Sequence, residues 1–197
     1  GRTVVGCYFA ARSGVRTVFE THAPVRESRF GRVLDVFFRR LIRQSSFDYL
    51  VVISDALRSY YREHYSSLGN ILVARDAADA VDESTEPAAL GSGDRLQVGY
   101  VGHLYQGRGM DLIADMARQF PAMDFHVIGG DPEDVDRWED RLSDLETVTL
   151  YGFLPPGELD QYRLAFDVQL APYQRNLKTN AGHNTVQWMS PLKIFEY

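Results

Sequence analysis

The sequence alternates between strand-like and helix-like segments twice, once on each side of a polar stretch. In both halves, short β-rich or buried apolar runs are followed by amphipathic runs with helical spacing. This alternation is typical of parallel sheets whose strands are joined by helices in right-handed crossovers. We therefore predict an α/β fold with two Rossmann-like, doubly wound parallel sheets.

The predicted boundaries follow from these periods and from the turn residues between them. In the first half we expect strands over 15–22, 49–53 and 70–74, and helices over 28–44 and 54–61. In the second half we expect strands over 96–101, 125–128, 148–151 and 168–172, and helices over 110–120, 132–142 and 157–164. The stretch 79–94 is rich in Asp, Glu, Ser, Thr, Pro and Gly and is predicted to be a linker or a long surface loop. The expected domains are therefore 1–78 and 95–197.

Both domains are expected to be incomplete, because the chain lacks an initiating Met, enters structure at once and stops inside a helix. Its 197 residues are 45% hydrophobic, which is ample for packed cores. Cys7 is the only cysteine, so a disulfide framework is excluded and a reducing, cytoplasmic compartment is expected. No apolar run reaches the roughly 18 residues of a membrane-spanning helix.

Charge is divided unevenly along the chain. Residues 1–75 contain 12 Arg and 6 acidic residues, whereas residues 76–197 contain 9 basic and 21 acidic residues. A basic half attracts an anionic acceptor or the inner face of an anionic membrane, although Arg-rich solvated helix faces would give the same count. Nucleic acid is not an expected partner.

The helix over 28–44 carries an apolar face that bears on the same question. Its members recur at three-four spacing and are Phe30, Val33, Leu34, Phe37, Phe38, Leu41 and Ile42. The favoured interpretation is that this face packs into the core, and an interfacial membrane helix is the alternative.

Three glycine-bearing turns follow consecutive strands of the second sheet. They contain Gly102-His103, Gly129-Gly130 and Gly152-Phe153-Leu154. The carboxyl ends of parallel strands meet at one edge of a sheet, so these turns line one crevice. Glycine lets backbone approach a ligand, and Arg108 supplies a fork of donors for phosphate oxygens. The edge is predicted to bind a diphosphate.

The last eight residues, Ser190 to Tyr197, supply a second wall. They read as the start of a helix with Pro191 just inside it, and a helix start binds anions. Glu196, further along, is suited to accept hydrogen bonds from sugar hydroxyls. Phosphate and hydroxyl recognition together indicate a nucleotide-sugar.

These motifs resemble a known family. The Gly-His-Leu turn with Arg-Gly, the strand ending in Ile-Gly-Gly, Leu-Tyr-Gly-Phe-Leu, Ala-Pro-Tyr and the final Ser-Pro-Leu-Lys-Ile-Phe-Glu-Tyr are similar to those of the retaining glycosyltransferases of family 4. Glu20-Thr21-His22 also resembles the Glu-x-His of that family's N-terminal domain. The resemblance implies the GT-B fold and transfer of a sugar from a UDP- or GDP-type donor to a glycan, lipid or small-molecule acceptor, as in glycan biosynthesis.

The resemblance also implies roles for single residues. Glu196 would bind the ribose, Arg108 and Lys193 the diphosphate, and Phe153 and Leu154 would present backbone groups to the base. His103 stands where many relatives have Arg. The full implied donor set is Gly102, His103, Arg108, Gly130, Phe153, Leu154, Ser190, Pro191, Leu192, Lys193 and Glu196.

His22 is the candidate catalytic residue, as an orienting partner of the transferred sugar, and a structural histidine is the alternative. Trp188 occupies the position where the family often has a first Glu, so that carboxylate's role is unassigned. No Asp-x-Asp triplet is present, and neither a metal ion nor a further cofactor is expected. Two other functions stay open, a nucleotide-sugar epimerase of the same fold and a non-catalytic nucleotide-sugar-binding fragment.

Overall fold

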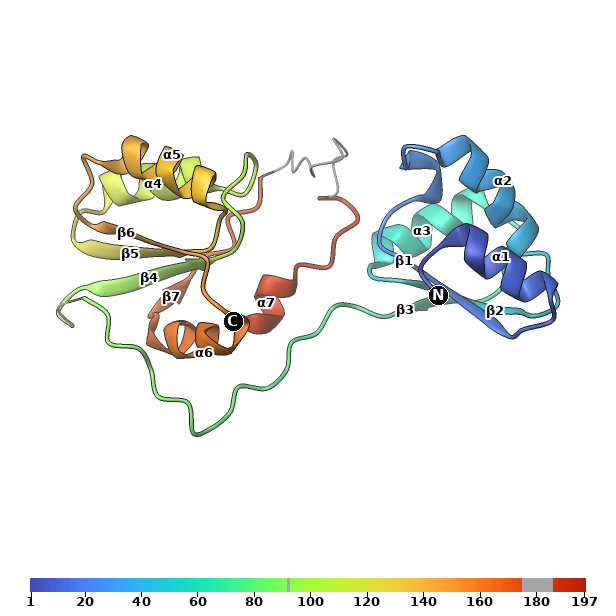
Figure 1. The fold of residues 1–197 in the computed structure, drawn as a ribbon, viewed down its shortest axis with the longest axis horizontal. Helices are drawn as coiled ribbons and strands as arrows, with labels where there is room; N and C mark the ends of the chain where they lie inside the picture. The colour runs from blue at the N-terminus through green and yellow to red at the C-terminus, as the bar shows by residue number, and fades with distance from the viewer. Residues whose placement is uncertain (92, 175–185) are drawn as a thin grey trace. The chain divides into compact units, whose positions relative to one another are not determined.

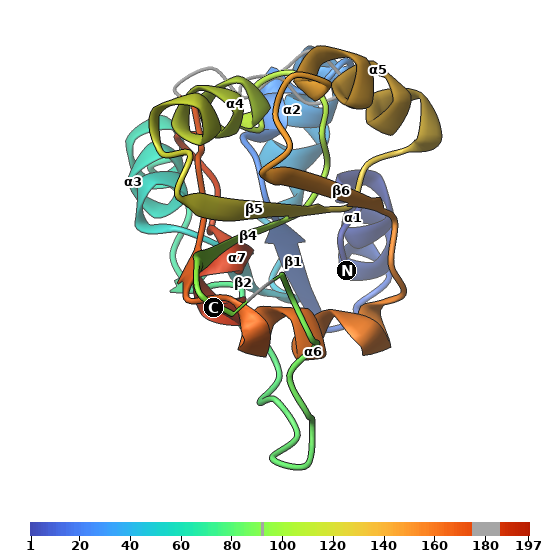
Figure 2. The same ribbon diagram turned by 90° about the vertical axis from the view of Figure 1, so that its left-hand side faces the viewer.

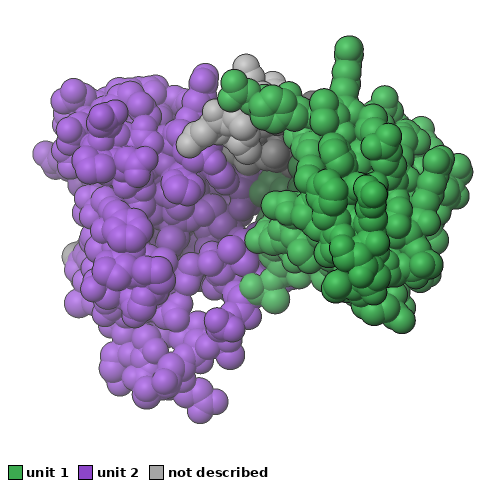
Figure 3. Space-filling view, turned by 45° about the vertical axis from the view of Figure 1, so that its right-hand side comes forward, with its two compact units in different colours: residues 1–77, 179–191 green, residues 78–178, 192–197 purple. Residues whose placement is uncertain are grey.

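A computed structural model describes most of the chain and divides it into two compact units, coloured separately in Figure 3. The described residues are 1–91, 93–174 and 186–197. Unit 1 contains the described residues 1–77 and 186–191. Unit 2 contains the described residues 78–91, 93–174 and 192–197.

Unit 1 is a parallel three-stranded sheet with helices between its strands (Figure 1). Its elements are α1 (Val4–Arg12), β1 (Thr17–Thr21), the 3-10 turn η1 (Val25–Glu27), α2 (Gly31–Leu41), β2 (Phe47–Val52), α3 (Asp55–His64) and β3 (Ile71–Val73). The strand order is β1-β2-β3. Helix α3 begins where the sequence predicts, because the Ser54 hydroxyl caps it by accepting from the Leu57 amide at 3.3 Å.

The core of unit 1 is built around aromatic rings. Phe38 of α2 is fully buried, and its ring centroid lies 4.8 Å from that of Tyr65 in an edge-to-face arrangement. Tyr61 is also fully buried, and its hydroxyl accepts from the Val25 amide at 3.0 Å and donates to the Ala23 carbonyl at 3.1 Å. The buried hydroxyl is thus satisfied on both sides.

Helix α1 is not among the predicted segments. It is nine residues long and includes two valines and Gly6, which all weaken helix propensity. Its buried side, including Val4, Cys7 and Ala11, packs into the core of unit 1. Tertiary packing therefore stabilises a helix that local preferences leave unmarked.

The predicted core face of α2 is only partly correct. Phe38, Leu41 and Ile42 are buried as expected, but Phe30 and Val33 are 65% and 58% exposed. Phe30 precedes the first helical residue. Val33 points about 80° away from Leu41 around the helix axis. Packing into the core is therefore wrong for these two side chains.

Unit 2 is a four-stranded, wholly parallel sheet in the order β6-β5-β4-β7. Its elements are β4 (Leu96–Val101), α4 (Met110–Gln119), β5 (Met123–Ile128), α5 (Pro132–Leu142), β6 (Val148–Gly152), α6 (Pro156–Ala165), β7 (Val168–Gln169) and α7 (Leu192–Glu196). Figures 1 and 2 show α4 and α5 over one face of this sheet and α6 over the other. The predicted α/β class with doubly wound parallel sheets is confirmed.

The polar stretch before β4 contains no helix or strand among its described residues. Its later part lies along α6, since the Ala88 amide donates to the Gln161 carbonyl at 2.8 Å. Leu90 packs against the small core cluster that contains Phe166. In the described parts of the chain, no helix has the length and apolar character needed to cross a membrane.

Candidate functional site

The carboxyl edge of the unit 2 sheet carries the three predicted glycine turns. Gly102 directly follows β4, Gly129 and Gly130 follow β5, and Gly152 ends β6, and each of these glycines has a positive φ. At Gly130, where φ is 90°, a Cβ would lie 2.7 Å from the Leu104 side chain, so both conformation and space require glycine there. A Cβ on Gly102 would collide with the Lys193 amino group.

A pocket of about 180 Å³ opens between these turns. Five of the predicted donor-binding residues line it, namely Gly102, His103, Gly130, Phe153 and Leu154. The remaining lining residues are Val101, Ile128, Gly129 and Leu159. Phe153, one of these lining residues, is 74% exposed. The pocket walls are apolar and fit a flat ring system better than a charged group.

Lys193 of α7 lies beside the pocket floor. Its amino group donates to the Val101 carbonyl at the end of β4 and sits 4.8 Å above the ring of Tyr100. Burial, with the nearby positive charge of Arg108 as a further cause, lowers the pKa of Lys193 to about 8. An anion bound here would stabilise the protonated amine.

Arg108, in the turn before α4, is held by one aromatic side chain. Its guanidinium stacks over the ring of Tyr105 at 4.7 Å and donates to the same residue's hydroxyl. The Arg108 Nε is buried and has no hydrogen-bond partner among the described residues. A buried donor without a partner is costly unless a ligand supplies one.

Glu196 forms an ion pair that the sequence patterns do not indicate. Its Oε2 lies 3.0 Å from Arg163 Nη2, and the two side chains are only 23% and 12% exposed. Arg163 also donates to Asp160 at 2.9 Å, while its Nε is buried without a partner. Arg163 lies in α6, a helix that the sequence predicts. No sequence motif marks this arginine as a site residue.

The C-terminal segment is shared between the two units. Helix α7 begins at Leu192, so Pro191 precedes the helix instead of opening it. Ser190 and Pro191 belong to unit 1, where the buried Ser190 hydroxyl accepts from the Asp76 amide at 3.0 Å. The hydroxyl therefore has a structural partner, and Leu192, Lys193 and Glu196 are the motif residues that lie in unit 2.

Trp188 is fixed within unit 1. Its carbonyl accepts from the Ser54 hydroxyl at 2.8 Å, and its indole N–H donates to Glu27 at 3.2 Å. The ring meets Tyr60 edge-on at 5.3 Å. The position thus serves packing in unit 1, and it supplies no carboxylate.

His22 follows the last residue of β1, at the carboxyl edge of the unit 1 sheet. Its Nε2 lies 2.8 Å from both Glu20 Oε1 and Arg2 Nη2, and its Nδ1 lies 3.1 Å from the same Arg2 nitrogen. The hydrogen bond from His22 lowers the pKa of Glu20. The imidazole is thus held between a carboxylate and a guanidinium. The catalytic role of His22 stays a prediction.

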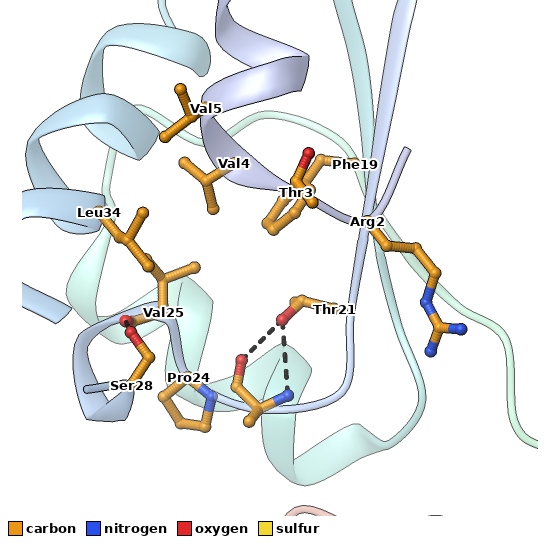
Figure 4. A pocket seen from close by; sticks show the side chains of 11 residues that line it. Arg2, Thr3, Val4, Val5, Phe19, Thr21, Pro24, Val25, Ser28 and Leu34 are labelled. Carbon is orange, nitrogen blue, oxygen red and sulfur yellow. Dashed lines mark hydrogen bonds between the residues drawn. The ribbon is translucent and has the colours of Figure 1, made fainter. Parts of the chain in front are cut away.

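A second pocket, of about 360 Å³, lies beside this histidine in unit 1. Figure 4 shows Val4, Phe19, Val25 and Leu34 turned toward the cavity, with the Arg2 guanidinium pointing away from it. The Thr21 hydroxyl is engaged by donating to the Ala23 carbonyl at 2.7 Å (Figure 4). The cavity is therefore lined mainly by apolar surface.

The described residues contain no group of three or more His, Cys, Asp or Glu side chains placed to hold a metal ion. Three cations of unit 2, Arg108, Arg163 and Lys193, act together with Glu196 around α7, because the charges of both arginines and of the carboxylate act on the pKa of Lys193. Arg163 is paired with both Asp160 and Glu196.

Comparison with known proteins identifies the fold through solved structures and not through sequence similarity. No protein-family profile and no curated protein sequence matches the chain. Among solved structures, sucrose-phosphate synthase from Thermosynechococcus elongatus matches over 87% of this chain and 49% of its own, with TM-score 0.62 and 18% identity. HepE from Anabaena, in complex with UDP and glucose, matches over 84% and 48%, with TM-score 0.60 and 17% identity.

Trehalose-6-phosphate synthase from E. coli, bound with UDP-2-fluoro glucose, matches over 94% of this chain and 54% of its own, with TM-score 0.61 and 13% identity. The chain thus spans about half the length of the structures it matches. These neighbours are GT-B glycosyltransferases, and the fold of this chain is of the GT-B type.

Proposed function

We propose that this chain belongs to a glycosyltransferase that moves a sugar from a nucleoside-diphosphate donor to an acceptor hydroxyl with retention of configuration. The observation that carries the proposal is the unit 2 edge, where Lys193 donates to Val101 of an apolar pocket and the charge of Arg108 acts on Lys193. The buried Arg108 Nε has no partner there. A base against apolar walls and a diphosphate on buried cations would match this arrangement.

Each residue has a role in this proposal. The backbone at Phe153 and Leu154 faces the base, and Gly102 and Gly130 allow main chain to approach the phosphates. Glu196, held on one side by Arg163, offers its remaining lone pairs to the ribose hydroxyls. The UDP–glucose complexes known for the similar HepE support a UDP-sugar as the first donor to test.

The proposed reaction requires stabilisation of the negative charge that develops on the leaving nucleoside diphosphate. The bond between the anomeric carbon and the diphosphate oxygen breaks, and the acceptor oxygen bonds to the same face of that carbon. Negative charge and the hydroxyl proton end on the diphosphate. Lys193 and Arg108 would stabilise this charge without a divalent cation. His22, whose ring nitrogens are engaged by Glu20 and Arg2, would orient the transferred sugar.

Calorimetric titration of the chain with UDP-, GDP- and ADP-sugars tests donor binding. Arg108→Ala removes the proposed charge-assisted contact to the diphosphate and should weaken binding of the best donor by about 1.5–3 kcal/mol. Arg118→Ala, on the exposed side of α4, is the matched control and should leave the affinity unchanged. Failure of every donor to bind, or equal affinity of the Arg108→Ala variant, would show that the site is misassigned.

Product analysis separates the remaining functions. Transfer requires an acceptor and gives a product whose anomeric configuration, read by NMR, equals that of the donor. An epimerase would isomerise the donor alone, and a binding fragment would turn nothing over. Activity that persists in EDTA supports the metal-independent mechanism, whereas activity restored only by a divalent cation contradicts it.

A further inference from the structure

Unit 1 carries an exposed surface that mixes large apolar side chains with arginines. We call it the α1–α2 face and define it by Phe9, Arg12, Phe30, Arg32, Val33, Val36, Arg40 and Arg43. Its four apolar side chains are between 47% and 65% exposed. Exposed apolar residues are ordinary when scattered singly, but a cluster of them indicates an interaction surface.

Most members of this face lie on two packed helices, while Phe30 and Arg43 lie just before and just after α2. Figure 1 shows α1 and α2 side by side, and the Phe9 ring lies 6.3 Å from that of Phe37 in α2. Along α2, Arg32, Val36 and Arg40 follow one another at i, i+4 spacing. Guanidinium groups and an apolar side chain therefore alternate along this exposed row of α2.

The arginines of the face are free of acidic partners. Among the described residues, Arg12, Arg32, Arg40 and Arg43 take part in no ion pair, whereas Arg39 of the same helix binds Asp35 at 3.0 Å. Asp35 is the only acidic residue of α2. It is 13% exposed and also accepts from the Tyr65 hydroxyl. No carboxylate of α2 thus neutralises the face.

We propose that unit 1 docks on an anionic lipid surface through the α1–α2 face. Phenyl and valyl side chains enter the boundary of the acyl chains, while the guanidinium groups bind lipid phosphates above them. Contacts to the arginines alone would leave Phe30 and Val33 in water, whereas a lipid surface offers both phosphates and acyl chains. The proposal does not rest on the transfer reaction, because it involves none of the donor-site residues.

Vesicle flotation tests the proposal, with phosphatidylcholine alone compared with a mixture of phosphatidylcholine and phosphatidylserine. The chain should float with the mixed vesicles and not with phosphatidylcholine alone, and added salt should release it. Arg40→Glu should weaken binding at least about fivefold. The matched variant Arg62→Glu, exposed on α3, carries the same charge change and should have much less effect.

The apolar contribution has its own pair of variants. Phe30→Asn should weaken vesicle binding about tenfold, whereas Leu72→Asn, at a similarly exposed position in β3, should not. Equal flotation with both lipid mixtures, or equal losses in each matched pair, would overturn the proposal. So would a concentration-dependent dimer without vesicle binding that Phe30→Asn abolishes, because the face would then belong to a second copy of the chain.

Discussion

Unit 1 and unit 2 share a parallel-sheet architecture but place their positive charges differently. In unit 1, Arg32 and Arg40 project outward, and the buried Tyr61 hydroxyl is satisfied by backbone. In unit 2, Arg108 and Arg163 each bury an Nε that has no partner. Within the described residues, every buried side-chain atom that lacks a partner lies in unit 2.

The difference shows how two similar sheets can meet different partners. A buried donor without a partner destabilises the folded state by about 1–3 kcal/mol. A ligand that accepts a hydrogen bond from this donor would recover that free energy. An exposed arginine stays hydrated and therefore has no desolvation cost. It attracts anions at long range, and salt weakens that attraction. In our proposals unit 2 therefore binds a small anion, whereas unit 1 binds an extended anionic surface.

The largest expected effect concerns stability within unit 1. Phe38→Ala removes a fully buried ring that contacts Phe19, Tyr61 and Tyr65, and should lower the free energy of unfolding by about 3–5 kcal/mol. Urea denaturation measures the loss, and hydrogen exchange locates it. The fastest-exchanging new amides should lie in β1, β2 and α3, and if they lay in unit 2 the division into separate cores would be wrong.

In unit 2, Phe153→Ala should have the opposite pattern, with little effect on stability and a measurable effect on ligand binding. Because this ring is 74% exposed, its removal should change the free energy of unfolding by less than about 0.5 kcal/mol. The same change should weaken UDP binding measurably, since the ring borders the predicted base pocket. A large stability loss with unchanged affinity would reassign Phe153 to packing.

A loss of stability smaller than that of Phe38→Ala is expected at the Arg163–Glu196 pair. Arg163→Met leaves the largely buried carboxylate without its partner and should cost about 1–3 kcal/mol in urea denaturation. The double variant Arg163→Met/Glu196→Leu replaces both charges and should recover much of that loss. The single variant Glu196→Leu completes the comparison. If the loss in the double variant equalled the sum of the losses in the two single variants, the two residues would not be coupled.

The fold could be read from the sequence wherever local signals agree with packing. Strand β4 and helix α5 have the predicted bounds, because a buried apolar run and a Pro-led amphipathic helix are both unambiguous. Helix α1 could not be read, because its nine residues include Gly6 and two valines. Short helices of this kind depend on tertiary contacts that sequence periods do not encode.

The candidate site divides in the same way. The glycine turns at Gly102 and Gly130 were predictable, because positive φ and close approach demand glycine. Arg163 was not, since its partner Glu196 lies 33 positions further along the chain and no spacing rule joins them. The packing of Trp188 against Tyr60 is likewise a contact between distant segments.

The smallest expected effect is a pH dependence inside unit 2. His126 is buried, with Nε2 2.7 Å from Gln97 Oε1 and Nδ1 2.9 Å from the Tyr151 hydroxyl. Burial lowers the pKa of His126 below its ordinary value of 6.5. Its contribution to stability is therefore complete above pH 6.5 and declines as the pH falls through the folded-state pKa. Urea midpoints from pH 8 to pH 5 should show this decline, and His126→Gln should flatten it.

The central claim, that buried cations of unit 2 bind a nucleoside diphosphate, is tested most directly by proton uptake on binding. Lys193 has a pKa of about 8, and a bound diphosphate should raise it. Calorimetry of UDP binding in buffers of different ionisation enthalpy should therefore detect uptake of a fraction of a proton at pH 8.5. At pH 6.5 Lys193 is already protonated and contributes no uptake. Lys193→Met should abolish the uptake at pH 8.5, and UDP binding without it in the unaltered chain would contradict the account.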